Sequence, residues 1–248
     1  MPAPTHDLRS LITAAESLVP GLGGRIGPPS PGQVVAGADN RDAVRRLVDG
    51  IAAHSPEAGR AYWAVRAWGM LTWQPAVLAV LGVHGTGLVP RLDAMGQSTA
   101  GTAVFGFTLP EEGVFRAPPP ALIAEAGARL RQVSDALLAD LRGVAAVKPV
   151  LAGRLLADRV LGTLVKVAPE PDRHAAAWLQ AMGLAGQSGI VPLALSDGRR
   201  RHGLDRRACC LAFRVDGGVL CASCPKRPEA ERLALMRMEW EDGNHVQA

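Results

Sequence analysis

Cysteine is scarce in this chain of 248 residues, which has only four. All four lie between positions 209 and 224. Lysine is rarer still, with three residues at Lys148, Lys166 and Lys226, so the formal charge of +4 comes mainly from arginine. The few aromatic residues are not interleaved with basic runs, as they are in many proteins that bind nucleic acids. We therefore expect no nucleic acid among the partners.

The chain also has no long apolar run free of polar residues. The best candidate, 61–83, contains Arg66, Gln74 and Pro75, which favours a buried helix with a proline kink over a membrane span. The first 21 residues show a helical repeat with early acidic residues, whereas a secretory signal needs an unbroken apolar stretch after a basic start. We expect a cytoplasmic protein, and contact with a membrane surface stays open as an alternative.

Several catalytic motifs are missing as well. The glycines of 20–32 have neither the spacing nor the preceding strand of a dinucleotide-binding loop, and this segment is too rich in Gly and Pro for regular structure. No serine stands in a G-x-S-x-G pattern, and the six histidines form no H-E-x-x-H pair. Hydride transfer, serine hydrolysis and zinc-protease chemistry are therefore not indicated.

Most of the chain has the apolar spacing and the Pro and Gly stops of helices, which we expect near 8–19, after the N-cap Asn40, from Pro56 through 61–83, at 122–141, from 149, from 171 and at 229–240. β-prone stretches interrupt them at 101–117, predicted as a hairpin around Pro110, and from Ile190 onward. The expected class is α+β and mainly helical. We expect a helical substrate-binding region at 1–198 and a C-terminal segment at 199–248 with a β-hairpin and a helix.

The cysteines lie in the stretch CCLAFRVDGGVLCASC, 209–224, where Asp-Gly-Gly predicts a tight turn between two strands. A two-residue loop would place Cys209 opposite Cys224, and a three-residue loop would pair Cys210 with Cys224. Either register brings the thiols together at the open end of the hairpin, about 5 Å apart across the strands.

Three interpretations compete for these thiols. Disulfides need an oxidising compartment, which the N-terminal sequence does not indicate. A structural zinc ion accepts four thiolates, but the adjacent pair Cys209 and Cys210 is unlike the usual C-x2-4-C knuckle. An iron-sulfur cluster also takes four thiolates and is wider, so two strands could each supply a pair. Spacing alone leaves zinc and iron-sulfur open.

The pattern C-C-x10-C-x2-C, formed by Cys209, Cys210, Cys221 and Cys224, resembles that of the FhuF-type ferric-siderophore reductases. The preceding arginines, an aromatic at Phe213, a glycine turn and a proline after the last cysteine extend the similarity. The resemblance implies that the four cysteines bind a [2Fe-2S] cluster. It further implies that the cluster passes one electron to the Fe(III) of a ferric siderophore, which releases Fe(II) in the cytoplasm.

Since the chain shows no nucleotide or flavin cradle, a separate electron-donor protein such as a ferredoxin is expected as a partner. Arg201, Arg206 and Arg207 precede the cysteines, and Phe213 follows them, as candidates to tune the cluster or to steer partners. The plain alternative for the arginines is a solvated loop. Two other functions stay open: a zinc-stapled, non-catalytic binding protein, and an iron-sulfur carrier or sensor that does not act on siderophores.

Overall fold

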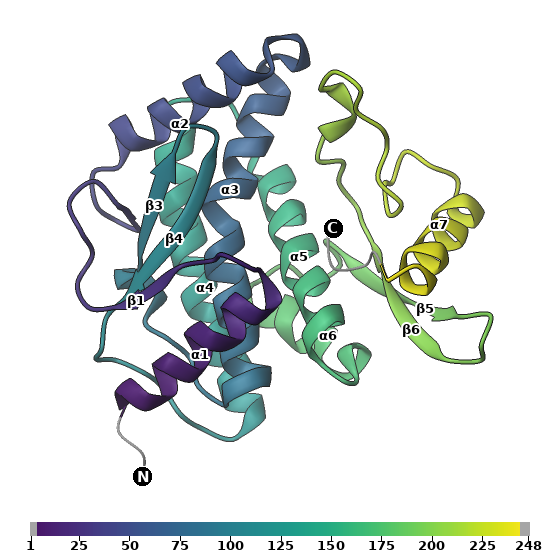
Figure 1. Ribbon diagram of the computed structural model, residues 1–248, viewed down its shortest axis with the longest axis horizontal. Helices are drawn as coiled ribbons and strands as arrows, with labels where there is room; N and C mark the ends of the chain where they lie inside the picture. Colours follow the sequence, from purple (N-terminus) through teal and green to yellow (C-terminus); the bar gives the residue numbers. More distant parts are fainter. Residues whose placement is uncertain (1–3, 244–248) are drawn as a thin grey trace.

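A bundle of helices carries a small sheet on one side and a C-terminal hairpin with a helix on the other (Figure 1). The computed structural model describes residues 4–243. Helix accounts for 55% of the residues and strand for 13%, which confirms the mainly helical α+β class. In the described range no helix is both long and apolar enough to cross a membrane.

In the described range the helical body contains six α-helices. They are α1 (Pro4–Leu18), α2 (Arg41–His54), α3 (Gly59–Leu81), α4 (Pro119–Arg142), α5 (Pro149–Val167) and α6 (Pro171–Ala181). The strands of the sheet lie between α1 and α2 and between α3 and α4. Shorter helical turns are η1 (Pro56–Ala58), the π-helix η2 (Gly82–Thr86) and η3 (Leu92–Ala94). Prolines begin α4, α5 and α6, where a missing N–H has no cost. The helices expected at these positions are thereby confirmed.

The small sheet has the strand order β1-β4-β3-β2, with bounds Gly24–Ile26, Ala103–Leu109, Gly96–Ala100 and Val34–Val35. Only β1 and β4 are parallel. Two sequence expectations are wrong here. The connector 20–32 does contain a strand, because β1 finds hydrogen-bond partners along the edge of β4. The hairpin turns at Gly101 and Thr102 rather than at Pro110, and Phe115 forms only an isolated bridge to Val89.

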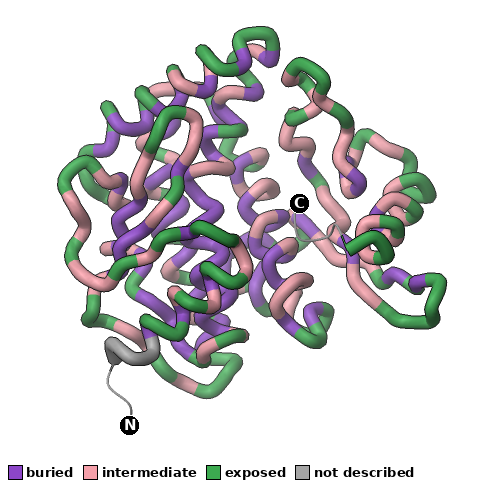
Figure 2. Tube along the Cα trace, in the orientation of Figure 1, coloured by how far each residue is buried: buried purple, intermediate pink, exposed green. Residues whose placement is uncertain are grey.

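Helix α3 runs through the centre of the body and is the most buried element (Figure 2). Trp68 on this helix donates its indole N–H to the carbonyl of Ala152 on α5 at 2.9 Å. Pro75 lies inside α3 and has no N–H for the carbonyl of Leu71, four residues earlier. The side chain of Gln97 on β3 donates to that carbonyl at 3.1 Å instead. A buried polar side chain thus satisfies the acceptor that the proline leaves open.

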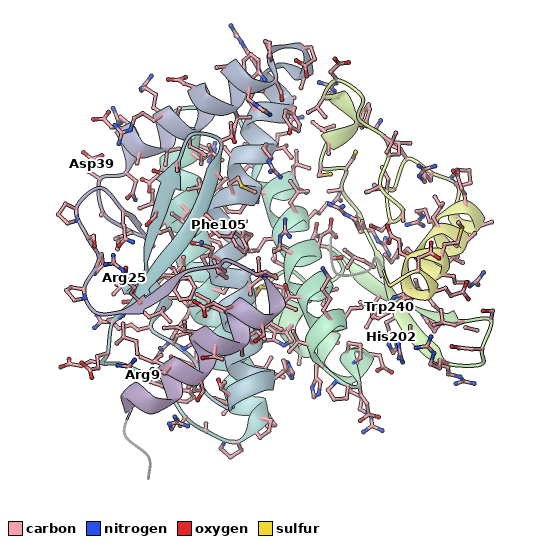
Figure 3. The ribbon with its side chains drawn as sticks, viewed as in Figure 1. Arg9, Arg25, Asp39, Phe105, His202 and Trp240 are labelled. Carbon is pink, nitrogen blue, oxygen red and sulfur yellow. The ribbon has the colours of Figure 1, made fainter. Side chains whose placement is uncertain are left out.

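The C-terminal part has its own small core. Strands β5 (Gly189–Ala194) and β6 (Arg200–Asp205) form the hairpin, and α7 (Glu229–Glu241) packs against it. Leu193, Ala222 and Met236 form the buried centre. Trp240 donates its indole N–H to the carbonyl of His202 at 3.0 Å, and both residues are labelled in Figure 3.

The expected division at residue 198 stays a prediction. We propose to move it to residue 188, because β5 pairs with β6 along its whole length and the two strands belong to one unit.

The role of Gln97 is open to test. We expect Gln97→Met to lower the free energy of unfolding by about 1–3 kcal/mol, because it leaves the buried Leu71 carbonyl without a donor. In a Pro75→Ala background the restored backbone N–H can serve that carbonyl, so the same change should cost clearly less. Denaturant unfolding of the four proteins of this double-mutant cycle measures the difference. Equal costs in both backgrounds would contradict the assignment.

Candidate functional site

All four cysteines lie on the loop between β6 and α7, at the right of the molecule in Figure 1. The prediction that two strands flank Asp-Gly-Gly is wrong. The turn itself is present, with Gly218 N–H bonded to Val215 O, but the residues before it form the 3-10 turn η4 (Ala212–Arg214). After it, the N–H of Cys224 bonds back to Cys221 O. The cysteine segment is thus a sequence of tight turns and not a ladder of strand pairs.

The thiols gather as two pairs. Cys209 Sγ and Cys224 Sγ are 3.8 Å apart, and the thiols of Cys210 and Cys221 are hydrogen-bonded to each other. The pairing of Cys209 with Cys224 is the one that a two-residue hairpin loop predicts, although no ladder connects them here. Within residues 4–243, no three side chains of His, Cys, Asp or Glu are grouped so as to hold a single metal ion.

The backbone directs N–H groups at the sulfur atoms. Leu211 has φ of 62°, the only positive φ outside glycine among the described residues. This left-handed turn, which disfavours most side chains, brings the N–H of Leu211 to 3.4 Å from Cys209 Sγ. The N–H of Ala212 is bonded to the thiol of Cys210. Amide N–H groups stabilise thiolates, so the turn prepares both adjacent cysteines as ligands.

The two thiols of the second pair differ in acidity. The bond from Cys221 lowers the pKa of Cys210 to about 5, although burial opposes this, and the same bond together with burial raises the pKa of Cys221. Burial also raises the pKa of Cys209. The contact between the two thiols therefore favours the thiolate form of Cys210 over that of Cys221.

Arg206 joins this loop to the helical body. Its Nη1 lies 3.6 Å from Cys221 Sγ, and its Nε donates to Asp158 Oδ2 on α5 at 3.1 Å. Asp158 is 3% exposed and also accepts a hydrogen bond from the hydroxyl of Ser188 at 2.6 Å. Arg206 is thus held between a buried carboxylate and a cysteine sulfur.

Residues 206–226, which contain both thiol pairs and Arg206, match a family model described as the FhuF 2Fe-2S C-terminal domain. This confirms the resemblance to the FhuF family for this segment. No solved structure matches the chain.

The donor set of this FhuF-type segment fits a centre with two metal ions. Two thiolates bound at about 2.3 Å to one tetrahedral metal would stand about 3.8 Å apart, which is the separation of Cys209 and Cys224. A [2Fe-2S] cluster takes four thiolates, two to each iron, so two pairs of thiols are the arrangement that it needs. A zinc ion bound by thiolates has the same metal–sulfur bond length of about 2.3 Å. Metal analysis distinguishes a zinc site from an iron-sulfur cluster.

The other predicted site residues lie elsewhere. Arg207 is exposed and pairs with Asp205 at 3.6 Å, and the guanidinium of Arg201 lies over the ring of Trp240. Phe213 packs under the ammonium group of Lys226, with 5.4 Å from the nitrogen to the ring centre. Of the four predicted neighbours, the structure therefore brings only Arg206 into contact with a thiol.

Sequence reasoning missed three residues around the FhuF-type segment. Arg227 donates hydrogen bonds to the carbonyls of Cys221 and Leu220, at 3.1 and 2.6 Å. These two bonds hold the part of the loop that carries Cys221. Asp158 and Arg159 come from α5, far away in the sequence. Burial lowers the pKa of Arg159, and the positive charges of Arg206 and Arg66 lower it further, while Cys210 opposes this. The only sequence signal was an Asp-Arg pair within an otherwise apolar stretch of helix.

The buried carboxylate gives a pH-dependent prediction. Burial raises the pKa of Asp158 to about 6, although Arg206 and Ser188 favour the carboxylate. A raised pKa in the folded state means that ionisation opposes folding, so this contribution to stability is lost as the pH rises through 6. Relative to Asp158→Asn, we expect the metal-free wild type to lose about 1 kcal/mol of unfolding free energy between pH 5 and pH 7.5. Urea unfolding across this range measures it; a constant difference would be evidence against the raised pKa.

Proposed function

We propose that this protein is a ferric-siderophore reductase that binds a [2Fe-2S] cluster through Cys209 and Cys224 on one iron and Cys210 and Cys221 on the other. The observation that carries the proposal is the pairing of the thiols within a segment that matches the FhuF 2Fe-2S domain. The backbone N–H groups of Leu211 and Ala212 and the guanidinium of Arg206 add the positive surroundings that such a centre needs.

When bound, the cluster supplies one-electron transfer, taking an electron from a donor protein of the ferredoxin type and giving it to Fe(III) in a chelate. Siderophores hold Fe(III) through hard oxygen ligands, and these ligands hold the less charged Fe(II) far more weakly. One electron per iron is therefore enough to release the metal as Fe(II). The protein's part is to hold the centre, set its potential and place the chelate beside it. We propose that this takes place in the cytoplasm.

The first test is the composition of protein purified without oxygen. We expect about two irons and two acid-labile sulfides per chain, with a visible absorption band that bleaches on reduction by dithionite. The dithionite-reduced protein should then release Fe(II) from a ferric trihydroxamate, which an Fe(II)-specific chromogenic chelator records. Cys224→Ala should lose the cluster and this activity together. One zinc per chain in colourless protein that takes up no cluster on reconstitution would refute the proposal and favour a zinc-stapled binding protein.

The contact of Arg206 with Cys221 predicts an effect on the reduction potential. Reduction adds negative charge to the cluster, and a buried cation next to a ligand sulfur stabilises that charge. We expect Arg206→Gln to lower the potential by tens of millivolts, on the order of the 59 mV that corresponds to a tenfold change for one electron. Arg207→Gln is the matched control, because Arg207 is exposed and touches no thiol. Protein-film voltammetry measures both, and equal potentials in wild type and Arg206→Gln would remove Arg206 from this role.

A further inference from the structure

A cavity of about 480 Å³ lies where the cysteine loop meets the helical body. Tyr62 and Arg66, four residues apart on the same side of α3, form one wall. Val215 and Asp216 of the loop form another, and the N–H of Asp216 donates to Glu57 Oε1 on η1 at 3.0 Å. The cavity is thus built by both parts of the protein and is closed on one side by a hydrogen bond between them.

Arg66 links this cavity to the thiols. It lines the cavity and is close enough to Arg159 to depress the pKa of that residue. On the loop side, Val215 directly follows the η4 turn, whose first N–H is bonded to Cys210. Helix α3 also packs against η4, so the cavity is bounded by the same loop that carries the thiols.

The charges in the cavity are unevenly distributed. Arg66 stands on the α3 wall, whereas Glu57 and Asp216 stand on the side of η1 and the loop. His54, from the last turn of α2, also lines the space. A ligand with anionic oxygens would turn them toward Arg66 and away from the two carboxylates. The guanidinium is a planar donor suited to carboxylate and phenolate oxygens, and Tyr62 adds an aromatic residue to the lining.

We infer that this cavity is the substrate seat of the reductase and that it takes a ferric chelate with anionic phenolate or carboxylate oxygens, which Arg66 binds. The inference rests on the proposed function and adds to it the place and the charge class of the substrate. The polar walls suit a chelate whose oxygens point outward, and a space of this size accepts a small-molecule ligand.

Binding is best tested with a probe that cannot be reduced. The gallium(III) complex of a triscatecholate chelator is negatively charged, and that of a trihydroxamate chelator is neutral. With cluster-loaded protein, titration calorimetry should show that Arg66→Gln weakens the binding of the triscatecholate about tenfold, as expected for the loss of one charge-assisted hydrogen bond. Binding of the trihydroxamate should change little. Arg60→Gln is the matched control, because Arg60 is exposed on the same helix and does not line the cavity.

Kinetics with the matching ferric triscatecholate provide the second measurement. Arg66→Gln should raise KM by a similar factor with little change in kcat, and Arg60→Gln should change neither. If the wild type reduces ferric chelates but Arg66→Gln binds and reduces the triscatecholate as well as the wild type does, the cavity assignment is wrong and the reductase function stands. If the cluster-loaded wild type neither binds the gallium complexes nor reduces the ferric ones, both the cavity and the function are overturned.

Discussion

The contact that the site depends on most is the one between Arg206 and Asp158. It is the buried ion pair between the cysteine loop and the helical body, and through Arg206 it reaches Cys221. Burial opposes the charged form of Arg206, but the Asp158 carboxylate and the thiols of Cys210 and Cys221 raise the pKa of this arginine. The guanidinium therefore stays charged inside the protein. A buried charge of this kind is tolerated only with partners. The position of the loop therefore depends on Asp158 of α5, and the buried Asp158 carboxylate depends on Arg206 of the loop.

This constraint explains why a large helical body accompanies a cysteine-bearing loop of about twenty residues. The C-terminal hairpin and α7 contain few buried residues (Figure 2). Their apolar core is centred on Leu193, Ala222 and Met236. Such a small core gives little stability, and small units of this kind usually depend on a metal or on a larger partner. Here α5 provides both a packing surface and a carboxylate. The body also contributes the α3 wall of the cavity, so both the attachment of the loop and the shape of the cavity depend on its helices.

Much of the fold was predictable because local signals and burial agree. Prolines at Pro149 and Pro171 mark helix starts, and the apolar spacing of 122–141 marks the buried face of α4. The sheet was predicted less well, since the pairing of β1 with β4 joins residues some 80 positions apart and leaves no mark in either segment. For the same reason the cysteines could be found from spacing and family resemblance, whereas Asp158 and Arg159 could not. Their role comes from the way α5 packs beside the loop, which is a property of tertiary structure.

The wrong prediction of a cysteine hairpin has a physical explanation that bears on function. In an antiparallel ladder, every second residue gives its N–H to the partner strand, and the next one points away from it. The N–H groups that remain lie in the plane of the ladder, whereas the cysteine side chains stand above or below that plane. In the observed turns, the left-handed Leu211 and the η4 turn free two successive N–H groups, which reach Cys209 and Cys210. The β-prone composition of the segment favours a strand, but in a strand the backbone N–H groups would bond to carbonyls of the partner strand and not to sulfur atoms. The strained backbone at Leu211 is the local cost of directing N–H groups at the thiolates, and it stands where the proposed function requires it.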